Sequence, residues 1–217
     1  VLEEVESQEQ KQLLQKLFVR VRGQTGKDFS RYKESTILRR ISRRMQLLQV
    51  EDLSDYVDML REDPEEIRAL ADQFLINVTN FFRDPEVFQA LEKDVIPRIF
   101  QGKDTEEDIR VWSVGCATGE EAYSLAILLA EEASRRNTNL RPQIFASDLH
   151  DASLRQAREG FYPGEIEADV GQERLKRFFR KEDGGYRIRE EIRELVVFAP
   201  HDLLSDPPFS RLDLILC

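Results

Sequence analysis

The stretch 109–148 constrains the fold of this chain more than any other part of the sequence. It opens with an apolar run, continues through a glycine-bounded loop at 115–119, and then carries a helical pattern to about Arg136. A second buried-strand pattern occupies 143–148. Strands that alternate with helices in this order predict a parallel sheet with crossover helices.

Two further strand patterns, at 195–199 and 212–217, extend the predicted sheet. Before them lie a helical pattern at 152–159 and a mixed segment, which contains a short helix at 172–179 and a glycine turn at 184–185. The second half of the chain is therefore predicted to be an α/β domain with a small insertion.

The N-terminal part of the chain reads instead as helices. Apolar side chains recur at helical spacing up to Gly23, which we expect to end the first helix. Asp52 and Asp84 stand where helix N-caps are expected. The run from Asp63 to Glu66 has the form of a capping box with proline at the first helical position.

Composition indicates a soluble globular protein, since 41% of the 217 residues are apolar and 34% are charged. The longest uncharged apolar stretch, 122–130, is too short to cross a bilayer, and no secretory signal opens the sequence. The two cysteines, Cys116 and Cys217, lack the spacing of a zinc site or a disulfide framework. We therefore expect a cytoplasmic protein with no structural metal and no membrane insertion.

The charge distribution points to a particular kind of partner. A net charge of −10 argues against nucleic-acid binding, yet the segment 31–44 carries six Lys or Arg residues and a single acid, Glu34. Such a run is most often a solvated helix face; the alternative is a docking surface for an acidic partner. At least two of its clustered arginines should be exposed, because burying unpaired arginine is costly. The cluster consists of Arg39, Arg40, Arg43 and Arg44.

The glycine loop carries the first chemical signature. Its small residues let a ligand approach the backbone just ahead of a helix N-terminus. The spacing of Gly115 and Gly119 matches neither the dinucleotide fingerprint nor the Walker motif. Glu120 and Glu121 in the first helical turn disfavour a phosphate and suit a cation or hydroxyl groups, such as those of S-adenosylmethionine. The structural alternative is a helix that Thr118 caps and its acids stabilise.

Two acids follow strands at the carboxyl edge of the predicted sheet, where α/β proteins bind ligands. Asp148 ends the second strand, where an acid accepts hydrogen bonds from ribose hydroxyls, although it could equally cap the next helix. Asp202 follows the third strand, where an ordinary loop acid is the alternative.

The segment Asn77-Val78-Thr79-Asn80-Phe81-Phe82-Arg83-Asp84 lies between two predicted helices. Its adjacent phenylalanines fit a core, and its last residue fits a helix cap. That structural account leaves Asn77, Thr79 and Arg83 unexplained.

Two long motifs taken together resemble a known family. The segment 77–84 and the run Trp112-Ser113-Val114-Gly115-Cys116-Ala117-Thr118-Gly119-Glu120-Glu121-Ala122-Tyr123-Ser124 are similar to the chemotaxis-receptor glutamate methyltransferases (CheR-type). The similarity continues through 146–148, 157–163, 198–200 and 213–217, so it covers nearly the whole chain. The sequences of 32–41 and 206–213 are most like versions fused to a CheB-type methylesterase.

The resemblance implies the architecture. An N-terminal all-helical, receptor-docking domain, 1–85, would precede a Rossmann-like class I methyltransferase sheet, 86–217, with an inserted β-subdomain at about 164–196. The sheet would have the strand order third, second, first, fourth, with further strands beyond the fourth.

The resemblance also implies the activity. The enzyme would transfer a methyl group from S-adenosylmethionine to glutamate carboxylates of a chemoreceptor's cytoplasmic domain, leaving S-adenosylhomocysteine and glutamate methyl esters in signal adaptation. Asn77, Thr79 and Arg83 would reach over the methionine part of the cofactor. Gly115 and Glu121 would line it from the glycine loop, Asp148 would bind ribose, and Asp202 with Leu203 would edge the adenine. The receptor-docking residues would be Arg39, Arg40, Arg43 and Arg44.

Both ends of the sequence are expected to be cut from a longer protein. Val1 is not an initiator methionine, and the family continues beyond Cys217 with further strands and site residues. The fourth strand would then lie at an edge, so we expect a C-terminally truncated chain that associates and is poorly active, or an incomplete view of a longer one.

Two other functions stay open on the residues alone. One is a class I methyltransferase with another acceptor, such as RNA or a small molecule. The other is a cofactor-binding signalling module that docks partners without turnover.

Overall fold

The structure is a computed structural model that describes residues 2–75, 79–103, 108–138 and 140–217. The chain forms two compact units, Val1–Ile76 and Asn77–Cys217, each described separately below. Residues 79–85, expected above at the end of the helical domain, belong to the second unit. No helix of the described part has both the length and the apolar character that a membrane span needs.

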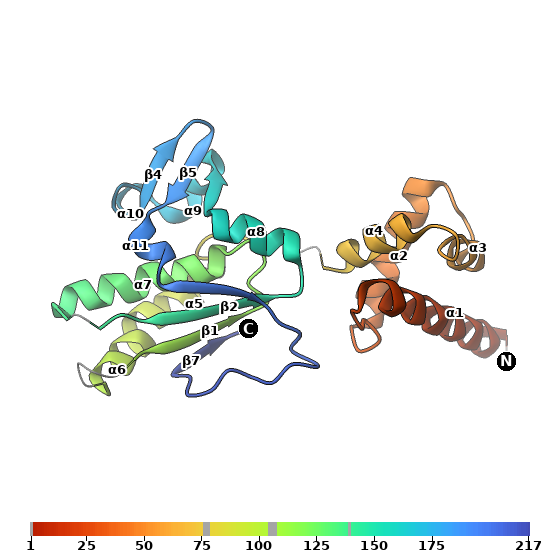
Figure 1. Cartoon of the computed structure of the whole chain (residues 1–217), viewed down its shortest axis with the longest axis horizontal. Coiled ribbons are helices and arrows are strands. Elements are labelled where there is room, and N and C mark those ends of the chain that lie inside the picture. Colours follow the sequence, from red (N-terminus) through yellow and green to blue (C-terminus); the bar gives the residue numbers. More distant parts are fainter. Residues whose placement is uncertain (1, 76–78, 104–107, 139) are drawn as a thin grey trace. The chain divides into compact units, whose positions relative to one another are not determined.

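The described residues of the first unit form helices, shown in red to yellow in Figure 1. They are α1 (Leu2–Thr25), α2 (Glu34–Leu48), α3 (Leu53–Met59) and α4 (Pro64–Phe74). Helix α4 packs against α1 and α2, and α1 also contacts α3. The core between them consists of buried apolar side chains, among them Leu17, Ile37, Ile41, Tyr56 and Leu70.

Among the helix ends of the first unit, the cap expected at Asp52 is confirmed, whereas the end expected at Gly23 is wrong. Helix α1 continues through Gly23 to Thr25, and the left-handed turn that ends it falls at Gly26, with φ +74° and an N–H that donates to the Arg22 carbonyl at 2.8 Å. A glycine inside a helix is tolerated at modest cost, so its presence alone does not mark the end. Asp52 caps α3 by accepting the Ser54 N–H at 2.7 Å.

The expected capping box at the start of α4 forms only on one side. Asp63 accepts the N–H groups of Glu65 and Glu66, both at 3.0 Å. The Glu66 side chain does not turn back to the cap. It is buried, and it binds Arg44 and Tyr56 instead.

The second unit is built on a parallel sheet with the strand order β6-β2-β1-β7. The strands are β1 (Arg110–Val114), β2 (Gln143–Asp148), β6 (Val196–Pro200) and β7 (Leu214–Leu216). This is the predicted order of third, second, first and fourth strand. Helix α7 (Glu120–Arg136) crosses from β1 to β2, and α8 (Asp151–Glu159) leads out of β2 (Figure 1).

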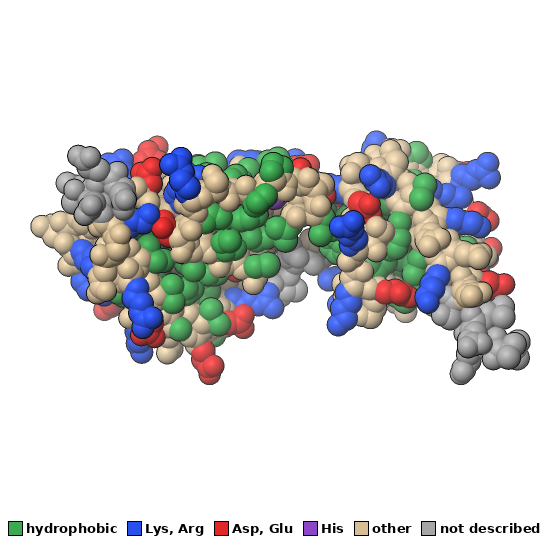
Figure 2. All heavy atoms as spheres, turned by 90° about the horizontal axis from the view of Figure 1, so that it is seen from below, with side chains coloured by type: hydrophobic (Ala, Val, Ile, Leu, Met, Phe, Trp, Pro, Cys, Tyr) green, Lys and Arg blue, Asp and Glu red, His purple; other side chains and the backbone are tan. Residues whose placement is uncertain are grey.

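The two faces of this sheet differ in what covers them. Alternate residues such as Val111 and Ile144 belong to the same buried core as α7. On the other face Trp112 pairs in register with Phe145 and Ile215, and Phe145 pairs with Val197. Val197 and Ile215 are 45% and 54% exposed. Seen from the side on which β7 lies, hydrophobic side chains gather on the surface of the second unit (Figure 2).

A helical run precedes the sheet. It comprises α5 (Pro85–Ala90), a π-helical turn η1 (Leu91–Val95) and α6 (Ile96–Gln101). The π turn ends two residues before Pro97, which has no N–H and whose ring would clash with the carbonyl four residues earlier in a regular helix. The wider turn accommodates that proline.

The inserted subdomain is a small antiparallel sheet with the order β3-β5-β4. Its strands are β3 (Phe161–Pro163), β4 (Phe179–Glu182) and β5 (Gly185–Ile188), and its helical turns are η2 (Gly164–Ile166), α9 (Glu167–Val170), α10 (Gln172–Phe178) and α11 (Glu190–Arg193). The sheet thus begins before the expected boundary at 164. Its first strand is three residues long and flanked by Gly160 and Gly164, so the sequence reads there as a turn.

Candidate functional site at the carboxyl end of the parallel sheet

The glycine loop folds back onto the end of β2. The Cys116 N–H donates to the Ser147 carbonyl at 2.9 Å, and the Ala117 N–H donates to Asp148 Oδ2 at 2.8 Å. Gly115 has φ +67°, and a Cβ added there would meet no atom within 4 Å. The loop therefore presents its backbone to open space beside a buried carboxylate.

Asp148 connects three segments of the chain at this edge of the sheet through its hydrogen bonds. Only 5% of it is exposed, and its Oδ1 accepts the His150 N–H at 2.8 Å while Oδ2 holds Ala117. Its main-chain carbonyl also accepts the His201 N–H, at 3.2 Å. Helix α8 has His150 at its N-cap position, so Asp148 supports that cap and does not occupy it. A carboxylate has about four acceptor sites, which leaves room for hydroxyl donors.

Two glutamates begin α7. Glu121 Oε1 accepts the Ser113 hydroxyl at 2.6 Å, and Glu120 accepts the Thr118 hydroxyl at 2.8 and 2.6 Å through its two oxygens. The structural alternative, in which Thr118 caps this helix, is therefore wrong: Gly119 holds the N-cap position, with φ +96°. Burial raises the pKa of both carboxyls, and for Glu121 the Ser113 bond and the charge of Arg83 oppose that rise.

The segment 79–84 reaches the same helix turn. The Phe82 N–H donates to Ser124 Oγ at 3.0 Å, and that hydroxyl donates to the Glu120 carbonyl at 2.7 Å. Thr79 is half-buried and Arg83 is exposed. Asn77 lies outside the described residues. Asp84 occupies the N-cap position of α5, but its side chain makes no capping hydrogen bond, which corrects the expected cap.

The loop after β6 carries Asp202 and Leu203. Asp202 Oδ1 accepts the Leu204 N–H at 2.9 Å, so this carboxylate braces its own turn, and the Leu203 side chain is 54% exposed. The loop is fixed at its start by His201, which bonds to Asp148, and its Phe209 ring stacks on Phe145 at 4.7 Å.

The structure thus brings Gly115, Glu121 and Asp148 to one edge of the sheet, and the charge of Arg83 acts on Glu121. Sequence reasoning missed Ser113, whose hydroxyl holds Glu121. The signal was a serine inside an otherwise apolar strand run, where it is fully buried.

The basic helix α2 uses its arginines in different ways. Arg39 and Arg43 are exposed, and Arg40 is half-buried. Arg44 binds the buried Glu66, with Nε donating to Oε1 at 3.0 Å, so its side chain is only 18% exposed. A surface that docks a partner would therefore be centred on Arg39 and Arg43.

Comparisons with known proteins match both units. Residues 77–217 match the family model described as "CheR methyltransferase, SAM binding domain", and residues 12–75 match "CheR methyltransferase, all-alpha domain". A "Chemotaxis protein methyltransferase" of Listeria innocua is 36% identical over 202 residues, which cover 91% of this chain and 73% of that protein. Its namesake in Borreliella burgdorferi is 28% identical over 199 residues, which cover 88% and 70%.

One relative is much longer. An "Uncharacterized 104.1 kDa protein" of Rhodobacter capsulatus is 44% identical over 190 residues, so the matched part spans 88% of this chain and 20% of that protein. The family models together account for nearly the whole chain, and their boundary at residues 75–77 coincides with the division between the two compact units. The chain belongs to the CheR methyltransferase family.

Proposed function

We propose that this protein transfers a methyl group from S-adenosylmethionine to glutamate side chains in the cytoplasmic domain of a chemoreceptor, which gives glutamate methyl esters. One observation carries the proposal. At the carboxyl edge of the sheet the buried carboxylate of Asp148 binds the glycine loop, in which the backbone of Gly115 faces open space. The family model that matches residues 77–217 is that of a SAM-binding domain, which identifies the cofactor as S-adenosylmethionine.

The residues at this edge fit that cofactor. Asp148 offers acceptors for ribose hydroxyls, Glu121 offers an anion for the positively charged methionine end, and Gly115 leaves room beside the backbone. Arg83 and Thr79 would lie over the methionine part, with Asn77 beside them in the sequence. Asp202 and Leu203 would border the adenine. When bound, the cofactor supplies an activated methyl group on a sulfonium.

The chain's own residues then have little acid–base work to do. A glutamate carboxylate has a reference pKa of about 4.3, so the acceptor is already ionised near neutral pH and needs no general base. Orienting the two reactants and removing water from the acceptor carboxylate are the tasks that remain. Arg83, a cation at the site, would guide that carboxylate or the cofactor.

The experiment is a transfer assay with methyl-labelled S-adenosylmethionine and a purified chemoreceptor cytoplasmic fragment. Label should appear in the fragment as base-labile methyl esters on glutamate. Cofactor binding without label transfer would favour a non-catalytic signalling module, and label on RNA or a small molecule would favour another acceptor. Either result contradicts the proposal.

Asp148→Ala should weaken S-adenosylhomocysteine binding by about 1–3 kcal/mol, because hydroxyl acceptors are lost from a buried position. Asp148→Asn should also weaken it, since both carboxylate oxygens receive N–H donors and an amide nitrogen cannot accept one. Calorimetry measures both, with far-ultraviolet circular dichroism to confirm folding. An unchanged affinity in a folded Asp148→Ala protein would remove Asp148 from the site.

Cofactor affinity should also fall on acidification. The fall should begin at a higher pH than the titration of an ordinary glutamate would give. Burial raises the pKa of Glu121 above the usual 4.5, so its anionic form is lost as pH falls through that raised value. For stability the sign is opposite, since a buried carboxylate with a raised pKa disfavours the folded state at neutral pH and its protonation relieves that cost. Binding titrations from neutral to acidic pH test this, and Glu121→Gln should remove the acid-side loss.

Docking of an acidic receptor surface is proposed for helix α2, on the strength of its exposed Arg39 and Arg43. Reversing both to glutamate should lower the rate of receptor methylation, and weaken its dependence on salt, without altering cofactor affinity. Reversal of Lys11 and Lys16 on α1 is the matched control. Equal effects of the two double variants would mean that net charge alone matters.

We further propose cooperation with a methylesterase, which would remove the methyl groups. Its support is the similarity of 32–41 and 206–213 to fused proteins, together with a much longer relative.

A further inference from the structure

Phe82 has a backbone conformation that a phenylalanine rarely adopts. Its φ is +50°, in the left-handed region, where a bulky side chain is strained. Strain of this kind persists only when the surroundings hold the residue in place, and it collects at binding sites. The contacts of Phe82 therefore identify what holds the segment 79–84.

Three contacts of Phe82 with other described residues come from different elements. Its N–H donates to Ser124 Oγ at 3.0 Å, and its ring meets the Phe88 ring edge-on at 5.4 Å. The third contact comes from α10 of the inserted subdomain: the Arg174 guanidinium lies over the Phe82 ring, 4.6 Å from its centroid. A guanidinium over an aromatic face is attracted by the negative charge of that face.

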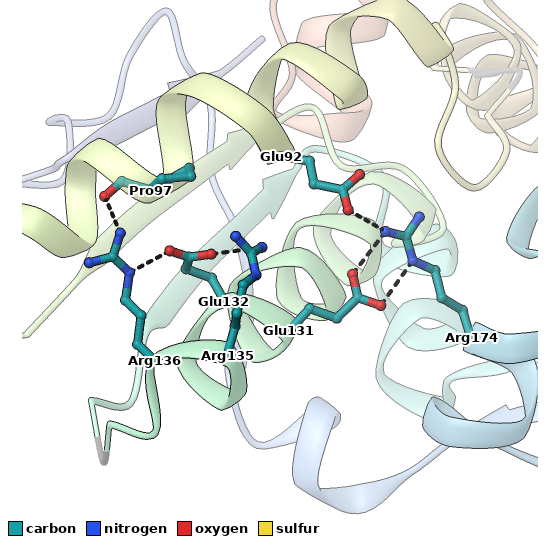
Figure 3. A network of polar contacts seen from close by, with 7 residues as sticks. All are labelled: Glu92, Pro97, Glu131, Glu132, Arg135, Arg136 and Arg174. Carbon is teal, nitrogen blue, oxygen red and sulfur yellow. Dashed lines mark hydrogen bonds and ion pairs between the residues drawn. The ribbon is translucent and has the colours of Figure 1, made fainter.

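Arg174 is itself fixed by two acids from the parallel-sheet domain. Its Nε and Nη2 donate to the two oxygens of Glu131 at 3.0 and 2.8 Å, and Nη2 also reaches Glu92 at 3.3 Å. Figure 3 shows this fork, with Glu131 coming from α7 and Glu92 from η1. These hydrogen bonds fix the orientation of the planar Arg174 guanidinium, which therefore stays over the ring of Phe82.

The neighbouring residue is also held by the subdomain. The Phe81 ring lies edge-on to Tyr162 of β3 at 4.9 Å and to Phe179 of β4 at 5.5 Å. Both phenylalanines of the motif thus contact the inserted subdomain. The next residue in the chain, Arg83, is left exposed, and its charge acts on Glu121.

We propose that Arg174 is a positioning residue for the cofactor site. It keeps Phe82 in its left-handed conformation and thereby places Arg83 near Glu121. The inserted subdomain therefore shapes the cofactor site through its contacts with Phe81 and Phe82. This inference rests on the proposed function, because Arg83 is taken there to bind the cofactor.

The test is a double-mutant cycle on S-adenosylhomocysteine affinity, measured by calorimetry. Arg174→Met should weaken binding about fivefold, the size expected of a partly buried cation–π contact. Arg177→Met is the matched control, since Arg177 lies on the same helix with its guanidinium over Phe178, and it should leave affinity unchanged. In an Arg83→Ala background Arg174→Met should have no further effect, because the two residues act through one path.

Additive losses in the double variant would overturn the inference, as would a loss of thermal stability in Arg174→Met with unchanged affinity. A wild-type protein that binds no S-adenosylhomocysteine would refute the proposed function instead. Arg174 is then still tested by amide hydrogen exchange of residues 79–84, which Arg174→Met should accelerate and Arg177→Met should not. If Arg174→Met leaves the amide exchange of residues 79–84 unchanged, Arg174 has no positioning role, whether or not the protein binds the ligand.

Discussion

Gly119→Ala should destabilise the second unit by about 2–4 kcal/mol and abolish measurable cofactor binding. A Cβ at this position would stand 2.9 Å from Ala157 Cβ, 3.1 Å from the Tyr162 hydroxyl and 3.2 Å from Phe198 Cζ. The φ of +96° adds backbone strain for any side chain. The Tyr162 hydroxyl donates to the Thr118 carbonyl at 2.7 Å, so relief of the overlap would displace the glycine loop itself.

Gly184→Ala separates strain from overlap. Gly184 also has a positive φ, +82°, but an added Cβ there meets nothing within 4 Å. This control should lose only about 1–2 kcal/mol, the cost of a left-handed side chain, and keep its cofactor affinity. Urea unfolding and calorimetry give the two quantities. Equal losses in the two variants would mean that packing around Gly119 has no special weight.

Glu66→Leu should destabilise the helical unit by about 3–5 kcal/mol, because it strips a buried ion pair of one partner. Glu66 is 5% exposed and accepts the Tyr56 hydroxyl at 2.6 Å as well as the Arg44 guanidinium. Tyr56 is fully buried, and burial raises the pKa of its hydroxyl above the usual range. Without Glu66 the buried hydroxyl and the cation have lost their acceptor.

The triple variant Arg44→Met, Tyr56→Phe, Glu66→Leu should recover most of that loss, since apolar side chains of similar size need no partner. Thermal unfolding of the three proteins, wild type, single and triple, decides the matter. A triple variant that is less stable than Glu66→Leu would contradict this expectation. It would mean that the remaining polar side chains, Arg44 and Tyr56, stabilise the fold even without Glu66. In both cases Arg44 is held by a buried carboxylate, and its place among the docking residues stays a prediction.

Much of the fold follows from local patterns. The strand order is instead implied by the family resemblance, and the structure confirms it. The four strands themselves follow from apolar runs, and Asp148 lies where a strand-end acid of a nucleotide-binding sheet is expected. These features are readable because each depends on residues near one another in the chain. An apolar run makes a buried strand, and the residue that ends it meets the ligand edge.

Other features depend on partners far apart in the sequence. The charge of Arg44 looks the same in the sequence as that of Arg43, and only Glu66, 22 residues away, tells them apart. The cation–π contact between Arg174 and Phe82 joins the inserted subdomain to the segment 79–84, and no periodic pattern in the sequence predicts it. Gly23 and Gly26 both have the character of a helix end, and the backbone selects the second.

The π turn η1 has a consequence for how this chain is compared with its relatives. Buried residues in the helical run fall at Phe88, Leu91, Ile96 and Phe100, so the spacing widens to five residues across the turn. The Ile96 N–H bonds to the Leu91 carbonyl, five residues back, directly before Pro97. One residue has in effect been accommodated in the helix without rotating its apolar face away from the core. A relative with no proline here needs no such residue, and a one-residue gap at this point in an alignment would then be the trace of a helix returning to its regular pitch.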